Sequence, residues 1–122
     1  MTDPQSITVS LEWAKKLQKA GWKFPAYMYF QPPGHTWEEK IPAPTAEEIF
    51  RRLPQDVIFH HELGDMEKRL FIRRFGKAEW IVFYCSADNV DIDMCYLSFS
   101  DISLANACAA MYVCLSDSKL LP

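Results

Sequence analysis

Residues 103–115 read Ser-Leu-Ala-Asn-Ala-Cys-Ala-Ala-Met-Tyr-Val-Cys-Leu, and this stretch predicts a helix around which the rest of the chain folds. Leu104, Cys108, Met111 and Leu115 form an apolar stripe with steps of four, three and four residues, which is the repeat of one helical face. Between its first and last leucines, Asn106 is the only clearly polar residue. A helix that is apolar on nearly every side must be covered on most of them, and Ser103 is its expected N-cap.

The length and composition indicate one folded domain over residues 1–122. A chain of this size buries roughly two-thirds of its extended-chain surface, so no disulfide or metal staple is needed. Its residues are 49% hydrophobic, and its formal net charge of -3 does not suggest a general nucleic-acid binder. No stretch approaches the roughly 18 apolar residues that cross a bilayer. We therefore expect a cytoplasmic protein with no membrane partner.

The first half of the chain predicts two helices and a hairpin. Residues 10–20 form an amphipathic helix pattern with Ser10 as N-cap, and a strand over 26–30 is followed by a turn and a returning strand over 37–41. Thr45 and Glu48 then have the spacing of a complete capping box. That box predicts a short helix over 46–53, which Pro54 ends.

The second half predicts an antiparallel sheet. A short strand over 56–61 is followed by the best hairpin candidate, with strands over 69–75 and 78–85. The second of these strands is apolar at both alternating sets of positions, which predicts a central strand covered on both faces. A last strand is expected over 94–99. The fold class is therefore α+β, with an antiparallel sheet of four to six strands packed against two or three helices.

Three motifs in this order resemble a family of small uncharacterised proteins from phages, prophages and gut-bacterial mobile elements. They are SLEWAKKLQKAGW at 10–22, APTAEEIFRRLP at 43–54 and SLANACAAMYVCL at 103–115. The chain departs from the family pattern at Asn106, Cys108 and Ala110, which weakens the last capping box and makes the last helix more apolar. The resemblance implies a phage-like genomic setting, and it supplies no catalytic residue.

Two patterns could carry metal or thiol chemistry. His60, His61, Glu62 and Asp65 are potential metal ligands, but adjacent strand residues point to opposite faces, so a half-exposed strand end is the favoured interpretation. The acidic stretch 88–93 lacks the glycine and distal glutamate of a calcium loop. The four cysteines lie in apolar contexts that raise a thiol pKa. We expect no catalytic residue, metal ligand or cofactor, and a metal-dependent or Cys/His enzyme is the second alternative.

A basic hairpin over Lys68 to Lys77 could contact nucleic acid, because it interleaves cations with aromatic residues. The candidate contacts are Arg69, Phe71, Arg73, Arg74 and Lys77. The first three would share one face of a regular strand. Acidic residues at 65, 67 and 79 favour cross-strand ion pairs instead.

The aromatic residues between positions 22 and 37 have two interpretations, an exposed patch or core packing, of which core packing is favoured for most. They are Trp22, Phe24, Tyr27, Tyr29, Phe30 and Trp37. With ample apolar material and no convergent titratable set, the leading hypothesis is a non-enzymatic protein-binding module, or one that forms a homodimer. A small nucleic-acid-binding accessory protein is the alternative.

Overall fold

The structure is a computed structural model that describes residues 8–26, 28–31, 33–34, 36, 39–59, 64–76, 79–86 and 97–121. These residues form an α+β fold, as predicted, with a four-stranded antiparallel sheet, a two-stranded sheet and three helices. The helices are α2 (Leu11–Lys19), α3 (Ala46–Phe50) and α4 (Leu104–Asp117). The strands are β1 (Met28–Phe30), β2 (Ile41–Ala43), β3 (Asp56–Phe59), β4 (Met66–Phe75), β5 (Glu79–Cys85) and β6 (Leu97–Asp101).

The larger sheet has the strand order β3-β4-β5-β6, and each neighbouring pair is antiparallel. The hairpin of β4 and β5 pairs Arg69 with Cys85 at one end and Phe75 with Glu79 at the other. Residues 81–85 of β5 are all buried, which confirms the central strand that its two apolar sets predict. At the turn, Gly76 has a φ of +68°, a conformation that glycine adopts without steric cost.

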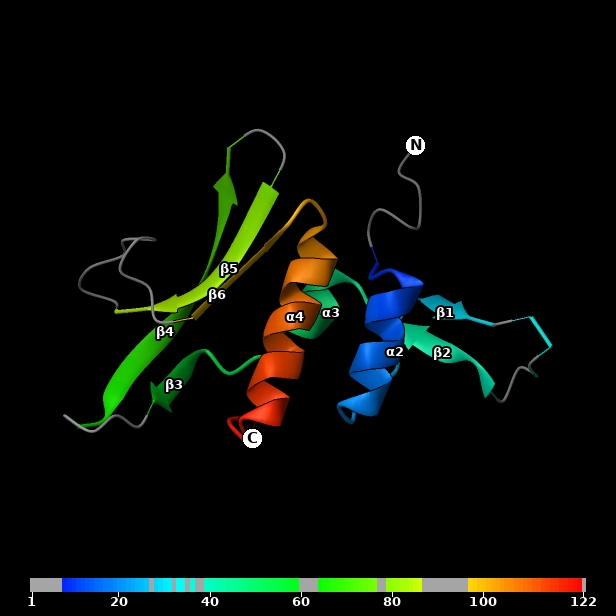
Figure 1. The fold of residues 1–122 in the computed structure, drawn as a ribbon, viewed down its shortest axis with the longest axis horizontal. Coiled ribbons are helices and arrows are strands. Elements are labelled where there is room, and N and C mark those ends of the chain that lie inside the picture. The colour runs from blue at the N-terminus through cyan, green and yellow to red at the C-terminus, as the bar shows by residue number, and fades with distance from the viewer. Residues whose placement is uncertain are drawn as a thin grey trace.

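Helix α4 lies in the middle of the molecule. It runs between the four-stranded sheet and α2, with α3 close to it, and β1 and β2 lie beyond α2 (Figure 1). Eight of its residues are buried, and Cys108, Met111 and Leu115 have no exposed surface. Its alanines allow close approach of the neighbouring elements while the larger side chains fill the remaining volume. The prediction of a helix covered on most sides is confirmed.

Two hydrogen bonds between distant parts of the sequence fix α2 beside α4. The Ser10 backbone N–H donates to Asn106 Oδ1 at 3.0 Å, and the Ser116 hydroxyl donates to the Ala20 carbonyl at 2.9 Å. One bond joins the N-terminal ends of the helices and the other joins their C-terminal ends, so the helices run parallel (Figure 1). Asn106, which weakens the capping box in the sequence pattern, thus serves to hold the two helices together.

Helix α3 begins at the predicted capping box and ends earlier than predicted. Thr45 Oγ1 accepts from the Glu48 N–H at 3.2 Å, and Glu48 Oε1 accepts from the Thr45 N–H at 2.9 Å. After Phe50 the backbone bonds tighten: the Arg52 N–H donates to the Ile49 carbonyl three residues earlier, and the Leu53 N–H is shared between the carbonyls of Phe50 and Ile49. The last turn of the predicted helix over 46–53 is therefore a pair of tight turns.

Strands β2, β4 and β6 differ from their predicted ranges. β4 begins at Met66, three residues before the predicted start at 69. The returning strand of the first hairpin is Ile41–Ala43; a turn in which the Glu39 N–H donates to the Thr36 carbonyl precedes it, and residues 37 and 38 of the predicted strand lie outside the described residues. β6 runs on to Asp101, which pairs with Trp80. Residues 94–96 of the predicted last strand lie outside the described residues. Of the described helices, none is long and apolar enough to cross a membrane.

Candidate binding site

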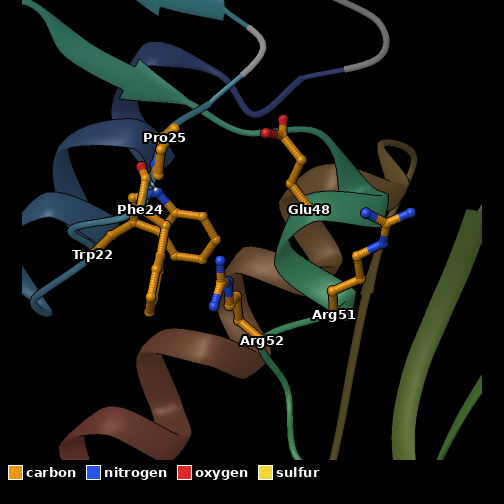
Figure 2. Close-up of a pocket in the computed structure, with 6 residues that line it drawn as sticks. All are labelled: Trp22, Phe24, Pro25, Glu48, Arg51 and Arg52. Atoms are coloured by element: carbon orange, nitrogen blue, oxygen red, sulfur yellow. Dashed lines mark hydrogen bonds between the residues drawn. The ribbon is translucent and has the colours of Figure 1, made fainter.

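A hollow of about 360 Å³ opens between the chain that follows α2 and the end of α3. Figure 2 shows its two walls, which are Trp22, Phe24 and Pro25 on one side and Glu48, Arg51 and Arg52 on the other. A second hollow of about 210 Å³ shares three of these residues and continues to Tyr112 of α4 and Leu121. Because the two hollows share these lining residues, we treat them as one surface, which we call the Arg52 groove.

The aromatic wall of the groove is held rigidly by its own contacts. Gly21 has a φ of +100°, and this left-handed residue turns the chain so that the Trp22 N–H donates to the Leu17 carbonyl at 3.0 Å. The Trp22 indole N–H then donates to the Phe24 carbonyl at 3.0 Å. Its ring packs edge to face against Phe24 and Tyr112, at centroid distances of 5.2 and 5.1 Å. The wall is therefore ordered without a ligand.

The arginine wall follows from the short helix α3. Arg51 forms an exposed ion pair with Glu47, one helical turn earlier, with 2.6 Å between Nη2 and Oε1. Arg52 takes another direction, since its guanidinium carbon lies 3.7 Å from the centroid of the Phe24 ring. In Figure 2, Arg52 extends toward the aromatic wall and Arg51 extends away from it. Arg52 is thus the cation of the groove.

Arg52 has no carboxylate within ion-pair distance among the residues that the structure describes. Helical spacing alone predicts a pair with Glu48, four residues earlier. The capping box instead directs the Glu48 carboxylate to the Thr45 N–H. A guanidinium that lies over a ring keeps the N–H donors at its edge accessible. Arg52 therefore offers a positive charge and several donors to a ligand.

Tyr112 forms the floor where the groove meets α4. Burial raises the pKa of the Tyr112 phenol above its ordinary value, and the positive charge of Arg52 partly offsets this rise. The phenol therefore stays protonated at neutral pH and can act as a neutral hydrogen-bond partner. Among the described residues that line the groove, it is the only one with a hydroxyl, and none of them carries a thiol or an imidazole.

The thiols that the structure describes are poorly placed for nucleophilic chemistry. Burial raises the pKa of the Cys108 thiol from about 9 to about 12, and Cys85 is buried in β5. The Cys114 pKa is also raised, chiefly by burial and then by Asp117, with a hydrogen bond to Ser118 acting in the opposite direction. A protonated, buried thiol is a weak nucleophile, as the apolar sequence contexts predict.

The predicted nucleic-acid contacts on β4 are divided between two faces of the sheet. Arg69, Phe71 and Arg73 share one face, as predicted, since they stand opposite Cys85, Phe83 and Ile81. Arg69 Nε lies 3.3 Å from Asp56 Oδ1, and the Phe71 ring stacks on Phe83 with centroids 5.6 Å apart. The predicted ion pairing thus occurs, but its acid comes from β3.

The other two predicted contacts do not join this face. Arg74 lies on the opposite side of the sheet, where its guanidinium is 5.3 Å from the centroid of the Trp80 ring. Lys77 lies outside the described residues. The arginines that the structure describes on this hairpin are therefore spread along β4 on both faces and do not converge on one point.

The predicted metal ligands fall mostly outside the described residues, which exclude His60, His61, Glu62, Cys95 and the acidic stretch 88–93. Asp65 is described and is exposed. Within the described ranges, no group of three or more His, Cys, Asp or Glu side chains is arranged to hold a metal ion.

The sequence pattern did not single out Arg51 and Arg52, although both belong to the motif that starts at Ala43. The spacing of charged residues along the helix could have indicated Arg52. Two acidic residues precede two arginines by one turn, and the capping box withdraws one of the acids. One arginine is then left over, but its contact with Phe24 depends on tertiary packing.

Comparisons with protein-family models, with curated proteins and with solved structures each found no match. The candidate function is therefore inferred from the Arg52 groove itself. Its features are a rigid aromatic wall, an arginine without a carboxylate partner among the described residues, and two hollows that share lining residues.

Proposed function

We propose that this protein is a non-enzymatic binding protein that holds a segment of a partner protein in the Arg52 groove. The observation that carries the proposal is the position of Arg52, whose guanidinium lies over Phe24 and is not paired with a described carboxylate. Arg, Trp and Tyr are the residue types that dominate binding energy at protein interfaces. Of these, Arg52 is exposed in the groove, whereas Trp22 and Tyr112 are 4% and 6% exposed and support the groove from below.

The rigidity of the groove supports binding. Trp22 is 4% exposed and contacts both Phe24 and Tyr112, so the aromatic wall loses little conformational freedom when a ligand arrives. Groups that are already ordered reduce the entropic cost of association. The lining residues also offer little for catalysis, because Glu48 is engaged by the capping box and Tyr112 stays protonated at neutral pH.

Selection from a displayed library of random-sequence peptides tests this proposal. The immobilised wild-type protein should enrich peptides whose binding is lost in Phe24→Ala and kept in Arg73→Ala. Arg73 is the matched control because it is exposed and lies on β4, away from the groove. The proposal fails if no peptide is enriched, or if the enriched peptides bind the Phe24→Ala variant as well as they bind the wild type.

The genomic and cellular setting is a separate part of the proposal. The order of the three sequence motifs supports a phage- or mobile-element-type protein, and the identity of the neighbouring genes tests it. The free thiols of Cys108 and Cys114 support a reducing, cytoplasmic location. Fractionation of cells that produce the protein checks the location, and recovery in an oxidising compartment would contradict it.

Self-association stays a prediction, which the two large exposed apolar residues that the structure describes do not strengthen. Ile58 is 51% exposed and Ile102 is 74% exposed. Ile58 belongs to β3 and Ile102 follows β6, so these residues lie at opposite edges of the four-stranded sheet. They do not combine into one patch. Light scattering checks the prediction, since a mass of about one chain at all concentrations would exclude a stable dimer.

A further inference from the structure

The Arg52 groove also indicates the chemistry of its occupant. We infer that the bound segment presents an Asp or Glu carboxylate to Arg52, next to an apolar side chain that packs against Phe24 and Pro25. This inference rests on the proposed function, because it specifies which partner segments the groove accepts. The sequence of a suitable partner would therefore contain an acidic residue beside an aromatic or aliphatic one.

The charges around the groove limit how much negative charge its ligand can bring. Arg51 and Arg52 are matched in number by Glu47 and Glu48, so the walls carry no net charge. Arg51 is paired with Glu47 and the Glu48 carboxylate accepts from the Thr45 N–H, so the local positive charge at Arg52 is met best by a single carboxylate. A phosphate monoester carries a charge of about -1.5 to -2 at neutral pH, which exceeds the single positive charge of Arg52. The excess negative charge would be repelled by the nearby carboxylates of Glu47 and Glu48. A nucleic-acid strand would bring a further negative charge with every nucleotide.

The orientation of Arg52 also favours a carboxylate. The Phe24 ring covers one face of the guanidinium at 3.7 Å and shields it from water on that side. The N–H donors at the edge of the planar group remain available, and their spacing matches the two oxygens of a carboxylate. Figure 2 shows Arg52 extended toward the rings from the end of α3. The contact with Phe24 thus already directs the side chain toward the groove.

The rest of the groove accounts for the apolar neighbour and for an extended segment. Pro25 is exposed and Phe24 is half-buried, so both retain apolar surface at the rim. The second hollow continues from Arg52 to Tyr112 and the half-buried Leu121. A ligand that fills both hollows spans more than one residue. An extended peptide meets this requirement better than a compact small molecule.

The experiment uses the peptides enriched on the wild-type protein, resynthesised in three forms. One form keeps the selected sequence, one replaces Asp by Asn and Glu by Gln, and one replaces the acidic residue by phosphoserine. Affinities are measured for the wild type, Arg52→Gln, Arg52→Lys and the control Arg73→Gln. We expect the amide form to bind the wild type at least about tenfold more weakly, the loss typical of a hydrogen-bonded charge.

The pattern across the variants decides the inference. In Arg52→Gln the acid and amide forms should bind equally, in Arg52→Lys the preference should be partly retained, and in Arg73→Gln it should be unchanged. Groove-dependent peptides without an acidic residue would overturn this inference and leave the proposed function intact. Tighter binding of the phosphoserine form would overturn it in favour of a phosphate ligand. If the selection yields no groove-dependent peptide, both the inference and the proposed function fail.

Discussion

The Arg52 groove and the β4–β5 strand pair both combine arginines with aromatic rings. Arg74 of the strand pair lies over Trp80 much as Arg52 lies over Phe24, so the contrast between the two regions is the one between Arg69 and Arg52. On the strand pair, Arg69 pairs with the Asp56 carboxylate of the neighbouring strand. In the groove, Arg52 lies over Phe24 at 3.7 Å and pairs with no described carboxylate. The first arrangement satisfies a charge within the sheet, whereas the second leaves a charge available to a ligand.

A high density of basic residues in the sequence therefore does not by itself indicate a binding surface. Side chains of consecutive strand residues point to opposite faces, so Arg73 and Arg74 are separated by the sheet although they are adjacent in sequence. The groove contains fewer cations. Its lining residues come from the segment after α2, the end of α3 and the middle of α4. Side chains that are distant in the sequence thus meet at one place, as a binding site requires.

The largest effect is expected from the residue that supports the aromatic wall. Trp22→Ala should lower the free energy of unfolding by about 3–5 kcal/mol, because it leaves a cavity between Phe24 and Tyr112. Urea denaturation measures the loss. Trp13→Ala is the matched control, since Trp13 is only half-buried on α2, and its loss should be clearly smaller. Equal losses would mean that the wall is not a packed unit.

The second effect is a loss of stability at high pH that comes from the buried thiol of Cys108 on α4. The Cys108 pKa is about 12 in the folded protein and about 9 when exposed, so the folded state disfavours the thiolate. The free energy of unfolding does not depend on Cys108 titration below about pH 9. It falls as the pH rises from 9 toward 12, because the unfolded chain loses the thiol proton first, and about 1 kcal/mol is lost by pH 10. Urea midpoints at pH 8 and pH 10 measure this slope. An unchanged slope in Cys108→Ala would show that another group is responsible.

A third effect links the capping box to the groove. Thr45→Ala should cost about 1 kcal/mol of stability through loss of the cap. It should also weaken peptide binding, because a Glu48 carboxylate released from the box can pair with Arg52. Ser103→Ala removes the N-cap of α4 and is the control for stability alone. Comparable binding by the two variants would contradict the role of the box in keeping Arg52 available.

The smallest effect on stability is expected for two arginine substitutions that should differ clearly in binding. Arg52→Gln and Arg73→Gln should each change the free energy of unfolding by only about 0.5 kcal/mol, because both side chains are exposed. Only Arg52→Gln should reduce peptide binding. Binding of a single-stranded oligonucleotide at low salt, weakened by Arg73→Gln alone, would instead support the predicted nucleic-acid contact on the hairpin.

Much of the fold could be predicted from the sequence, because its signals are local. The serine and threonine caps at Ser10, Thr45 and Ser103 all accept the expected backbone N–H groups. The two apolar sets of β5 correctly indicate a central strand, and the apolar residues of α4 correctly indicate a covered helix. The link from Asn106 to Ser10 could not be predicted, since it joins residues 96 positions apart.

The candidate site was less predictable, for a physical reason. The sequence shows that Arg52 follows a capping box and that Phe24 follows a helix that ends at a glycine. Neither segment predicts that the Arg52 and Phe24 side chains meet, because their contact depends on how α2 and α3 each pack against α4. Local patterns specify the elements, and the site arises only from their packing.

The indole N–H signals of Trp22 and Trp80, recorded by NMR while an enriched acidic peptide is added, test the central claim most directly. The Trp22 indole donates to the Phe24 carbonyl beneath the groove, and Trp80 lies under Arg74 on the sheet. Binding in the Arg52 groove predicts that the Trp22 signal shifts with increasing peptide while the Trp80 signal stays in place. A shift of the Trp80 signal with no change at Trp22 would contradict the account.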